Sequence, residues 1–268
     1  MTSEVRPALA EELERRVLPL MQRLHRRIRA SVLEAFRTRE LTSLAGVAGD
    51  EGGDTIYEVD RVSEEVLIEE LGREASALGG IVLVAEGLAG GRLVLPAGLA
   101  ERQARYLVIV DPIDGTRGLM YQKRSAWVLT GVAPNVESPR LSDVALAVQT
   151  ELPLVKQYLA DELWAVRGRG LHAARVNVLT GQTTPLELSP SKAATIEHGF
   201  AMLTRFFPGA RDAIAALDEE LVRALLGPLP PGRAACFEDQ YISTGGQLYE
   251  LIAGHDRFNA DLRPLFDR

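Results

Sequence analysis

Residues 108–118 read VIVDPIDGTRG, a hydrophobic run that leads into two aspartates three positions apart, with proline and glycine around them. The hydrophobic part is typical of a buried β-strand, and Asp-Pro and Asp-Gly are common turn dipeptides. A tight turn can direct the carboxylates of Asp111 and Asp114 and the carbonyl of Ile113 toward one point. These are hard oxygen ligands of the kind that Mg²⁺ prefers. The stretch therefore predicts either an ordinary loop or a metal-binding corner at the end of a strand.

A second predicted strand, IVLVA at residues 81–85, also runs into an acidic residue, Glu86. A carboxylate at the mouth of a buried strand is costly unless it is paired, hydrogen-bonded or bound to a cation. If the two strands are adjacent, Glu86 joins Asp111 and Asp114 in one cluster, and a cation would relieve their repulsion. The segment after Asp114 is expected to open a helix whose free N–H groups bind an anion. This pattern favours metal and phosphate chemistry.

Composition and charge limit the class of protein. The chain of 268 residues has a formal net charge of −7 and is 46% hydrophobic, enough for a large core. The acidic balance argues against a nucleic-acid-binding protein. The single cysteine, Cys236, excludes an internal disulfide and a cysteine-based zinc site. No signal peptide or membrane-length apolar run is found. We therefore expect a cytoplasmic protein that binds neither nucleic acid nor membrane.

The order of predicted elements indicates a mixed α/β chain with helices packed on sheets. Apolar residues at steps of three and four predict a long amphipathic helix over residues 8–37, whose arginine-rich face is expected to be solvated. A soft boundary near residues 135–150 suggests an N-terminal lobe, 1–140, and a C-terminal lobe, 141–268. Further elements are expected as a helix from Asp60, strands within 125–134, 143–151 and 162–170, one or two helices within 191–226, and a turn into a helix within 239–258.

The motif VDPIDGT resembles the signature of the inositol monophosphatase family. That family belongs to the lithium-sensitive, magnesium-dependent phosphatases, a superfamily that includes fructose-1,6-bisphosphatase. Other stretches are similar to the family pattern, and the similarity extends over roughly residues 10–268. The resemblance implies an α/β (α+β) fold, a layered αβαβα sandwich in which the N-terminal α+β lobe carries the metal site. The similar stretches are DTIYEVD (54–60), VAEG (84–87), the strand and hairpin at 161–189, and STGGQLYELIAG (243–254).

The resemblance also implies roles for individual residues. Asp54 and Thr116 would position and deprotonate the attacking water, and the N–H groups of Gly115 and Thr116 would bind the phosphate. The implied activity is hydrolysis of an inositol phosphate or a similar small polyol or sugar phosphate monoester, by a protein that is expected to be a homodimer. Two or three Mg²⁺ ions would be bound by four groups: Glu86, Asp111, the Ile113 carbonyl and Asp114.

The sequence departs from the family pattern at three places. Tyr57 stands where the family has threonine, and Gly87 replaces the second glutamate of its Gly-Glu-Glu motif. Both changes remove polar groups near the expected metals. The family also has an aromatic-aspartate pair in the second lobe, which is matched here by LFD, ending at Asp267. The second-lobe metal ligand would be Asp267 or a residue beyond the end of this chain, and the usual last strand-helix unit is expected to be absent.

Two other functions are kept as alternatives. A nucleotide 3′-phosphatase is suggested by Arg117, which follows DGT where the nucleotidase branch of the family has lysine. A non-catalytic binding protein with the same fold is suggested by Tyr57, Gly87 and the position of the chain end. Retention of Asp54 and Thr116 together with the acidic ligand set speaks against that reading, because a scaffold needs none of them.

Overall fold

The computed structural model describes the backbone of residues 7–38, 47–51, 54–230 and 232–266. Side chains are described for residues 7–37, 63–88, 90–230 and 232–266. The chain divides into two compact units, Met1–Glu187 and Leu188–Arg268. The first unit contains the strands that precede the predicted metal ligands, and the second contains a small parallel sheet with three helices.

The described part of the first unit contains four helices and several short helical turns. The helix expected over residues 8–37 begins as α1, passes through a π-helical turn in which the Leu18 N–H donates to the Leu13 carbonyl, and continues as α2. The helices are α1 (Pro7–Glu12), the π turn (Leu13–Val17), α2 (Leu18–Thr38), α4 (Glu58–Leu78) and α5 (Thr116–Met120); the 3-10 turns are Ala89–Gly91, Glu101–Gln103 and Leu141–Asp143.

The first unit is built on an eight-stranded sheet with the strand order β10-β9-β8-β7-β6-β5-β3-β4, beside which β1 and β2 form a separate antiparallel pair. Neighbours in the large sheet are antiparallel except β3 and β5, which are parallel. The expected lobe boundary at 140/141 falls between β6 and β7, which are paired strands of this sheet. The strands are β1 (Val47–Glu51), β2 (Asp54–Tyr57), β3 (Ile81–Ala85), β4 (Arg92–Leu95), β5 (Tyr106–Asp114), β6 (Ala126–Pro134), β7 (Leu146–Leu152), β8 (Leu159–Val166), β9 (Leu171–Asn177) and β10 (Thr183–Pro185).

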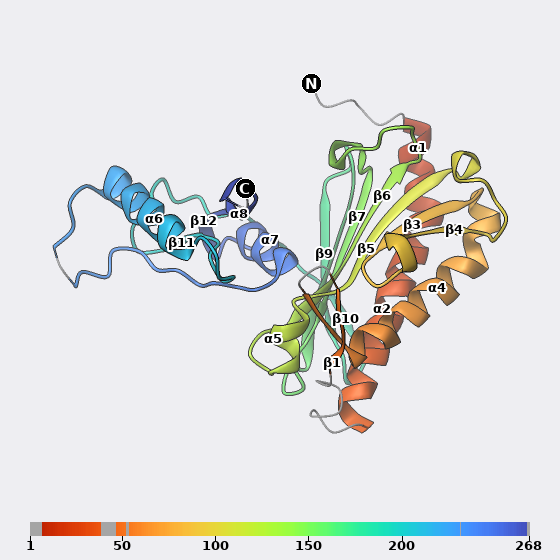
Figure 1. The fold of residues 1–268 in the computed structure, drawn as a ribbon, viewed down its shortest axis with the longest axis horizontal. Helices are drawn as coiled ribbons and strands as arrows, with labels where there is room; N and C mark the ends of the chain where they lie inside the picture. The colour runs from red at the N-terminus through yellow and green to blue at the C-terminus, as the bar shows by residue number, and fades with distance from the viewer. Residues whose placement is uncertain (1–6, 39–46, 52–53, 231, 267–268) are drawn as a thin grey trace. The chain divides into compact units, whose positions relative to one another are not determined.

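Helices α2 and α4 cover one face of the large sheet, as Figure 1 shows. Apolar residues that recur at helical spacing on α2, such as Leu24, Ile28 and Val32, are fully buried. Leu67 and Leu71 of α4 are also fully buried. Alternating residues of β5 and β7 are buried in the same core from the side of the sheet. The core therefore lies between the apolar stripe of each helix and the inward-facing side chains of the strands.

A polar group is enclosed in this core between α2 and the sheet. The side chain of His25 has no exposed surface, and its Nδ1 lies 3.0 Å from the Thr150 hydroxyl oxygen and its Nε2 2.7 Å from that of Thr130. Burial, with a smaller contribution from the Arg29 charge, lowers the pKa of His25 to about 3. The imidazole is therefore neutral, with one ring nitrogen donating and the other accepting.

The arginine-rich face of α2 is only in part the solvated face expected from the sequence. Glu162 of β8 is buried, and its carboxylate accepts hydrogen bonds from Arg26, at 2.9 Å, and from Arg29, at 2.6 Å. The Arg29 side chain is 8% exposed, whereas that of Arg26 is 52% exposed. The expectation is wrong for Arg29 because the helix turns this residue toward a strand that supplies a buried counter-charge.

The described part of the second unit consists of a parallel pair of strands and three helices. Ser243 caps α7, since its hydroxyl accepts the Gly246 N–H at 2.9 Å, and the expected turn into a helix is therefore present. No helix in the described ranges of the chain is long and apolar enough to cross a bilayer. The elements are β11 (Phe200–Leu203), α6 (Arg211–Leu226), α7 (Thr244–Ile252), β12 (Asp256–Ala260) and α8 (Arg263–Phe266).

Candidate metal centre

The carboxyl ends of β3 and β5 bring two of the predicted ligands to one edge of the sheet. In this parallel pair Ala85 lies opposite Val110, so the residues that follow, Glu86 and Asp111, stand at neighbouring positions. Glu86 is exposed, and Asp111 is half-buried. The adjacency that the sequence reasoning assumed between these two strands is therefore present.

The backbone between the two aspartates differs in one respect from the expected turn. Strand β5 does not end at Asp111 but continues to Asp114. Asp111 pairs with Leu129 and Asp114 with Trp127, so three steps on β5 match two steps on β6. The extra residue makes a β-bulge, a feature that tilts a strand and redirects its side chains. Proline explains the location, because it has no N–H to give to a regular ladder.

Local hydrogen bonds fix the bulge and the residues after it. The Ile113 N–H donates to Asp111 Oδ1 at 3.1 Å, and the Thr116 hydroxyl donates to the Ile113 carbonyl at 2.7 Å. Ile113 itself is buried, with 4% of its surface exposed, and anchors the segment. Three of the groups predicted for the site, on Asp111, Ile113 and Thr116, are thus held in defined positions by hydrogen bonds within a six-residue segment.

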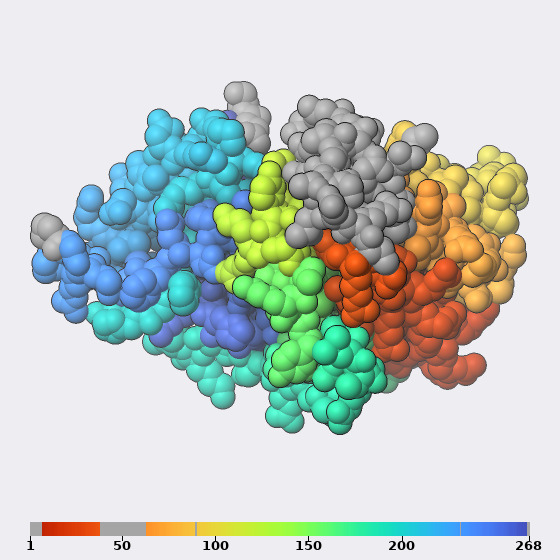
Figure 2. All heavy atoms as spheres, turned by 90° about the horizontal axis from the view of Figure 1, so that it is seen from below, coloured from red at the N-terminus to blue at the C-terminus, as the bar shows by residue number. Residues whose placement is uncertain are grey.

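Gly115 turns the strand into helix α5. Its φ of 96° lies in the left-handed region that favours glycine, and its carbonyl accepts the Leu119 N–H at 3.2 Å. Leu119 and Met120 are buried and hold α5 to the unit. The yellow-green segment around α5 is at the surface on the face seen in Figure 2. The N–H groups of Gly115 and Thr116 thus stand at the start of a short, anchored helix.

Other predicted site residues lie wholly or partly outside the described residues. Asp54 is placed in β2, opposite Glu51, but its side chain is outside the described part, and so is Asp267. Among the described residues, no three Asp, Glu, His or Cys side chains converge closely enough to hold a metal ion. The donor chemistry nevertheless fits Mg²⁺, because Glu86, Asp111 and the Ile113 carbonyl all offer oxygen at one strand edge.

One acidic residue beside this edge, Glu64, was not predicted from the sequence. Glu64 of α4 lies against Gly87, two residues after β3, and a Cβ built on Gly87 would overlap its carboxyl group. Glu64 is half-buried. The signal in the sequence was indirect: a glycine where the family pattern has glutamate, and an acid near the start of the preceding helix.

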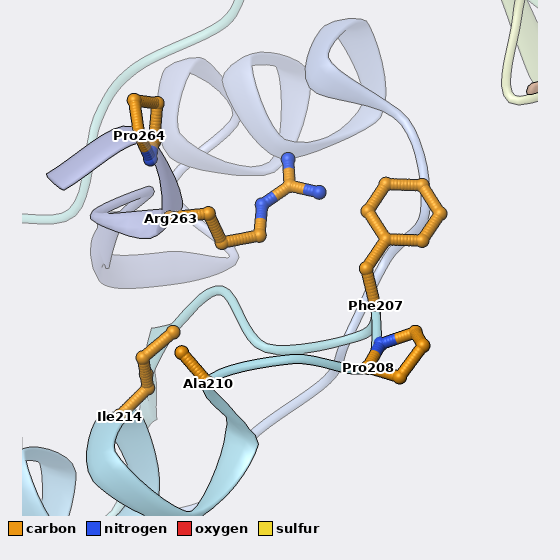
Figure 3. A pocket seen from close by; sticks show the side chains of 6 residues that line it. All are labelled: Phe207, Pro208, Ala210, Ile214, Arg263 and Pro264. Atoms are coloured by element: carbon orange, nitrogen blue, oxygen red, sulfur yellow. The ribbon is translucent and has the colours of Figure 1, made fainter. Parts of the chain in front are cut away.

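A pocket of about 390 Å³ lies in the second unit. Figure 3 shows Arg263 extending between the walls of this pocket, which include Phe207 and Ile214. The Arg263 guanidinium stacks over the rings of Phe206 and Phe207, with 4.4 Å and 4.8 Å to their centroids. It also donates to Asp261, and this hydrogen bond lowers the pKa of that carboxyl group. The pocket cation is therefore already neutralised, and we assign no function to it.

The comparisons with known proteins identify the fold. No protein-family model and no curated protein sequence matches the chain. Among solved structures, it is similar to the extragenic suppressor protein SuhB from Bartonella henselae, with 15% identity and a TM-score of 0.63 over 90% of this chain and 76% of that one. An inositol monophosphatase–fructose-1,6-bisphosphatase matches with 16% identity and a TM-score of 0.56 over 90% and 76%.

A third similar structure is an IMPase/NADP phosphatase in complex with NADP and Ca²⁺, with 14% identity and a TM-score of 0.56 over 90% of this chain and 72% of that one. The chain thus has the mixed α+β fold of the inositol monophosphatase and fructose-1,6-bisphosphatase structures. The fold class predicted from the sequence, and the resemblance at the level of the fold, are confirmed.

Proposed function

We propose that this protein is a metal-dependent phosphomonoesterase acting on an inositol phosphate or a similar small polyol or sugar phosphate. The observation that carries the proposal is the hydrogen-bonded bulge from Asp111 to Thr116, placed beside Glu86 at the end of a parallel strand pair. The shared fold supports it, because similar structures include an inositol monophosphatase–fructose-1,6-bisphosphatase. One similar protein was crystallised with a divalent cation, Ca²⁺.

In this proposal two or three Mg²⁺ ions are held by a set of oxygen donors. When bound, the ions supply Lewis acidity that stabilises negative charge on the phosphoryl and leaving oxygens. The Ile113 carbonyl has two lone pairs, so the hydrogen bond from Thr116 leaves one for a cation. The donors are Glu86, Asp111, the Ile113 carbonyl and Asp114.

The remaining residues act on the water and the phosphate. The Thr116 hydroxyl donates a hydrogen bond to the Ile113 carbonyl, so its oxygen is oriented to accept a hydrogen bond from the attacking water. Asp54 receives the proton that this water loses. The N–H groups of Gly115 and Thr116 donate to the phosphate oxygens at the start of α5. Thr116 therefore contributes a side chain to the nucleophile and a backbone group to the substrate.

The test is phosphate release from a panel of monoesters, with and without Mg²⁺, together with Mn²⁺ binding by calorimetry. Asp114→Asn removes a charged ligand and should reduce metal affinity and turnover together by about 100-fold or more. Thr116→Ala should reduce turnover while Mn²⁺ still binds, because its side chain orients water and is not among the proposed ligands. Asp212→Asn, an exposed acid on α6, is the matched control and should change neither. Unchanged Mn²⁺ binding in Asp114→Asn would refute the site.

Arg117 decides between two classes of substrate. It is exposed on α5, next to the proposed phosphate-binding N–H groups. A guanidinium there can bind a second phosphate in bidentate fashion, as a nucleotide 3′-phosphatase would need. If it does, Arg117→Ala should lower kcat/KM for a nucleotide bisphosphate by about 10-fold, while a simple monoester changes little. Equal changes for the two substrates would favour the polyol phosphate, and no phosphate release from any monoester would favour a non-catalytic binding protein.

A further inference from the structure

The contact between Glu64 and Gly87 joins two elements at the proposed metal centre. A Cβ on Gly87 would overlap the Oε1 and Cδ atoms of Glu64, and Gly87 has φ +84°. A side chain at position 87 would therefore have to displace the Glu64 carboxyl group, and it would have to adopt a left-handed backbone conformation that favours glycine. The Glu64 carboxyl group therefore rests directly on the turn that follows Glu86.

The fold explains how α4 brings a carboxylate to this place. The helix ends at Leu78, and the Gly80 N–H donates to the Ala75 carbonyl at 2.8 Å as the chain turns back into β3. Helix and strand therefore run in opposite directions, so the first turns of α4 lie beside the carboxyl end of β3. Ser63 and Leu67 are fully buried. Their burial fixes how the helix is turned about its axis, and therefore the direction in which Glu64 projects.

We propose that Glu64 is a positioning residue of the metal centre, which holds the turn at Gly87 so that Glu86 is presented to the cation. The inference rests on the proposed function. Glu86 is exposed, and a ligand on an exposed turn binds a metal well only if other groups restrict its position. In this structure the Glu64 carboxyl group restricts the turn, because it is packed where position 87 has no side chain.

The experiment measures Mn²⁺ affinity by calorimetry, which needs no activity, alongside the Tm of each variant. Glu64→Ala should weaken Mn²⁺ binding by about 10-fold or more, the range for residues that orient a ligand. Glu64→Gln, which keeps the shape, should recover part of this loss. The control is Glu65→Ala, an exposed acid one position further along α4, which should bind as the wild type does.

A double-mutant cycle tests the contact itself. Gly87→Ala should lower the Tm less in the Glu64→Ala background than in the wild type, because the clash is then removed and only the backbone strain stays. Wild-type Mn²⁺ affinity in a folded Glu64→Ala, with binding lost in Asp114→Asn, would overturn this inference and leave the proposed function standing. Wild-type protein that binds no Mn²⁺, or unchanged binding in Asp114→Asn, would overturn the proposed function itself.

Discussion

The buried imidazole of His25 should make the stability of the first unit depend on pH. Its pKa is about 3 in the folded protein, against 6.5 for the free side chain. On acidification the unfolded chain therefore takes up the proton first, and the free energy of unfolding falls as the pH drops from 6.5 toward 3. Above 6.5 both states are neutral at this position, and the contribution of His25 is fully present.

The size of this effect follows from the two pKa values. Each pKa unit corresponds to about 1.4 kcal/mol, so His25 accounts for a loss of about 2 kcal/mol between about pH 7.5 and pH 5. The whole window approaches about 5 kcal/mol, a large fraction of the stability of a typical domain. Urea unfolding at the two pH values measures the difference, with His25→Gln as the variant, because its amide can still donate and accept but does not titrate.

The control separates pH dependence from simple loss of stability. Val32→Ala deletes two methyl groups from the same helix at a fully buried position, so it should lower the free energy of unfolding equally at both pH values. His25→Gln should instead flatten the pH dependence by about 2 kcal/mol. If His25→Gln keeps the full wild-type dependence on pH, the imidazole is not the titrating group, and the argument from its burial fails.

Two further substitutions test the packing of each unit. Glu162→Ala leaves the buried Arg29 without its carboxylate and should cost about 3–5 kcal/mol of unfolding free energy in urea, and a loss below about 1 kcal/mol would contradict the buried ion pair. Gly254→Ala places a Cβ 2.5 Å from the Ser189 carbonyl oxygen at a residue with φ +78°, and should lower the Tm. The control is Gly72→Ala, which adds a Cβ in open space on α4 and should not lower the Tm. A wild-type Tm for Gly254→Ala would refute this backbone conformation.

The predictions that the sequence supported well are those whose determinants lie close together along the chain. The helical spacing over residues 8–37 and the strands before Glu86 and Asp111 were read from periodicity, and the structure contains them. The π turn at Leu13–Val17 was not foreseen, because it leaves the apolar spacing nearly intact. The arginine face was misjudged at Arg29 because the sequence alone does not show which strand will lie opposite a helix.

In the candidate site, too, the contacts between residues close in sequence were predictable and the contact between distant residues was not. The bonds that fix the bulge join Asp111 to Ile113 and Ile113 to Thr116, two and three positions apart, so the quoted motif carries its own geometry. Glu64 and Gly87 are 23 positions apart and meet only because the chain turns back after α4, so that β3 runs antiparallel to the helix. From the sequence alone, Gly87 indicated the loss of a carboxylate at that position. In the fold, the carboxyl group of Glu64 from α4 occupies the space that a side chain at position 87 would fill. A departure from a family motif is therefore interpreted correctly only with the neighbours that tertiary structure supplies.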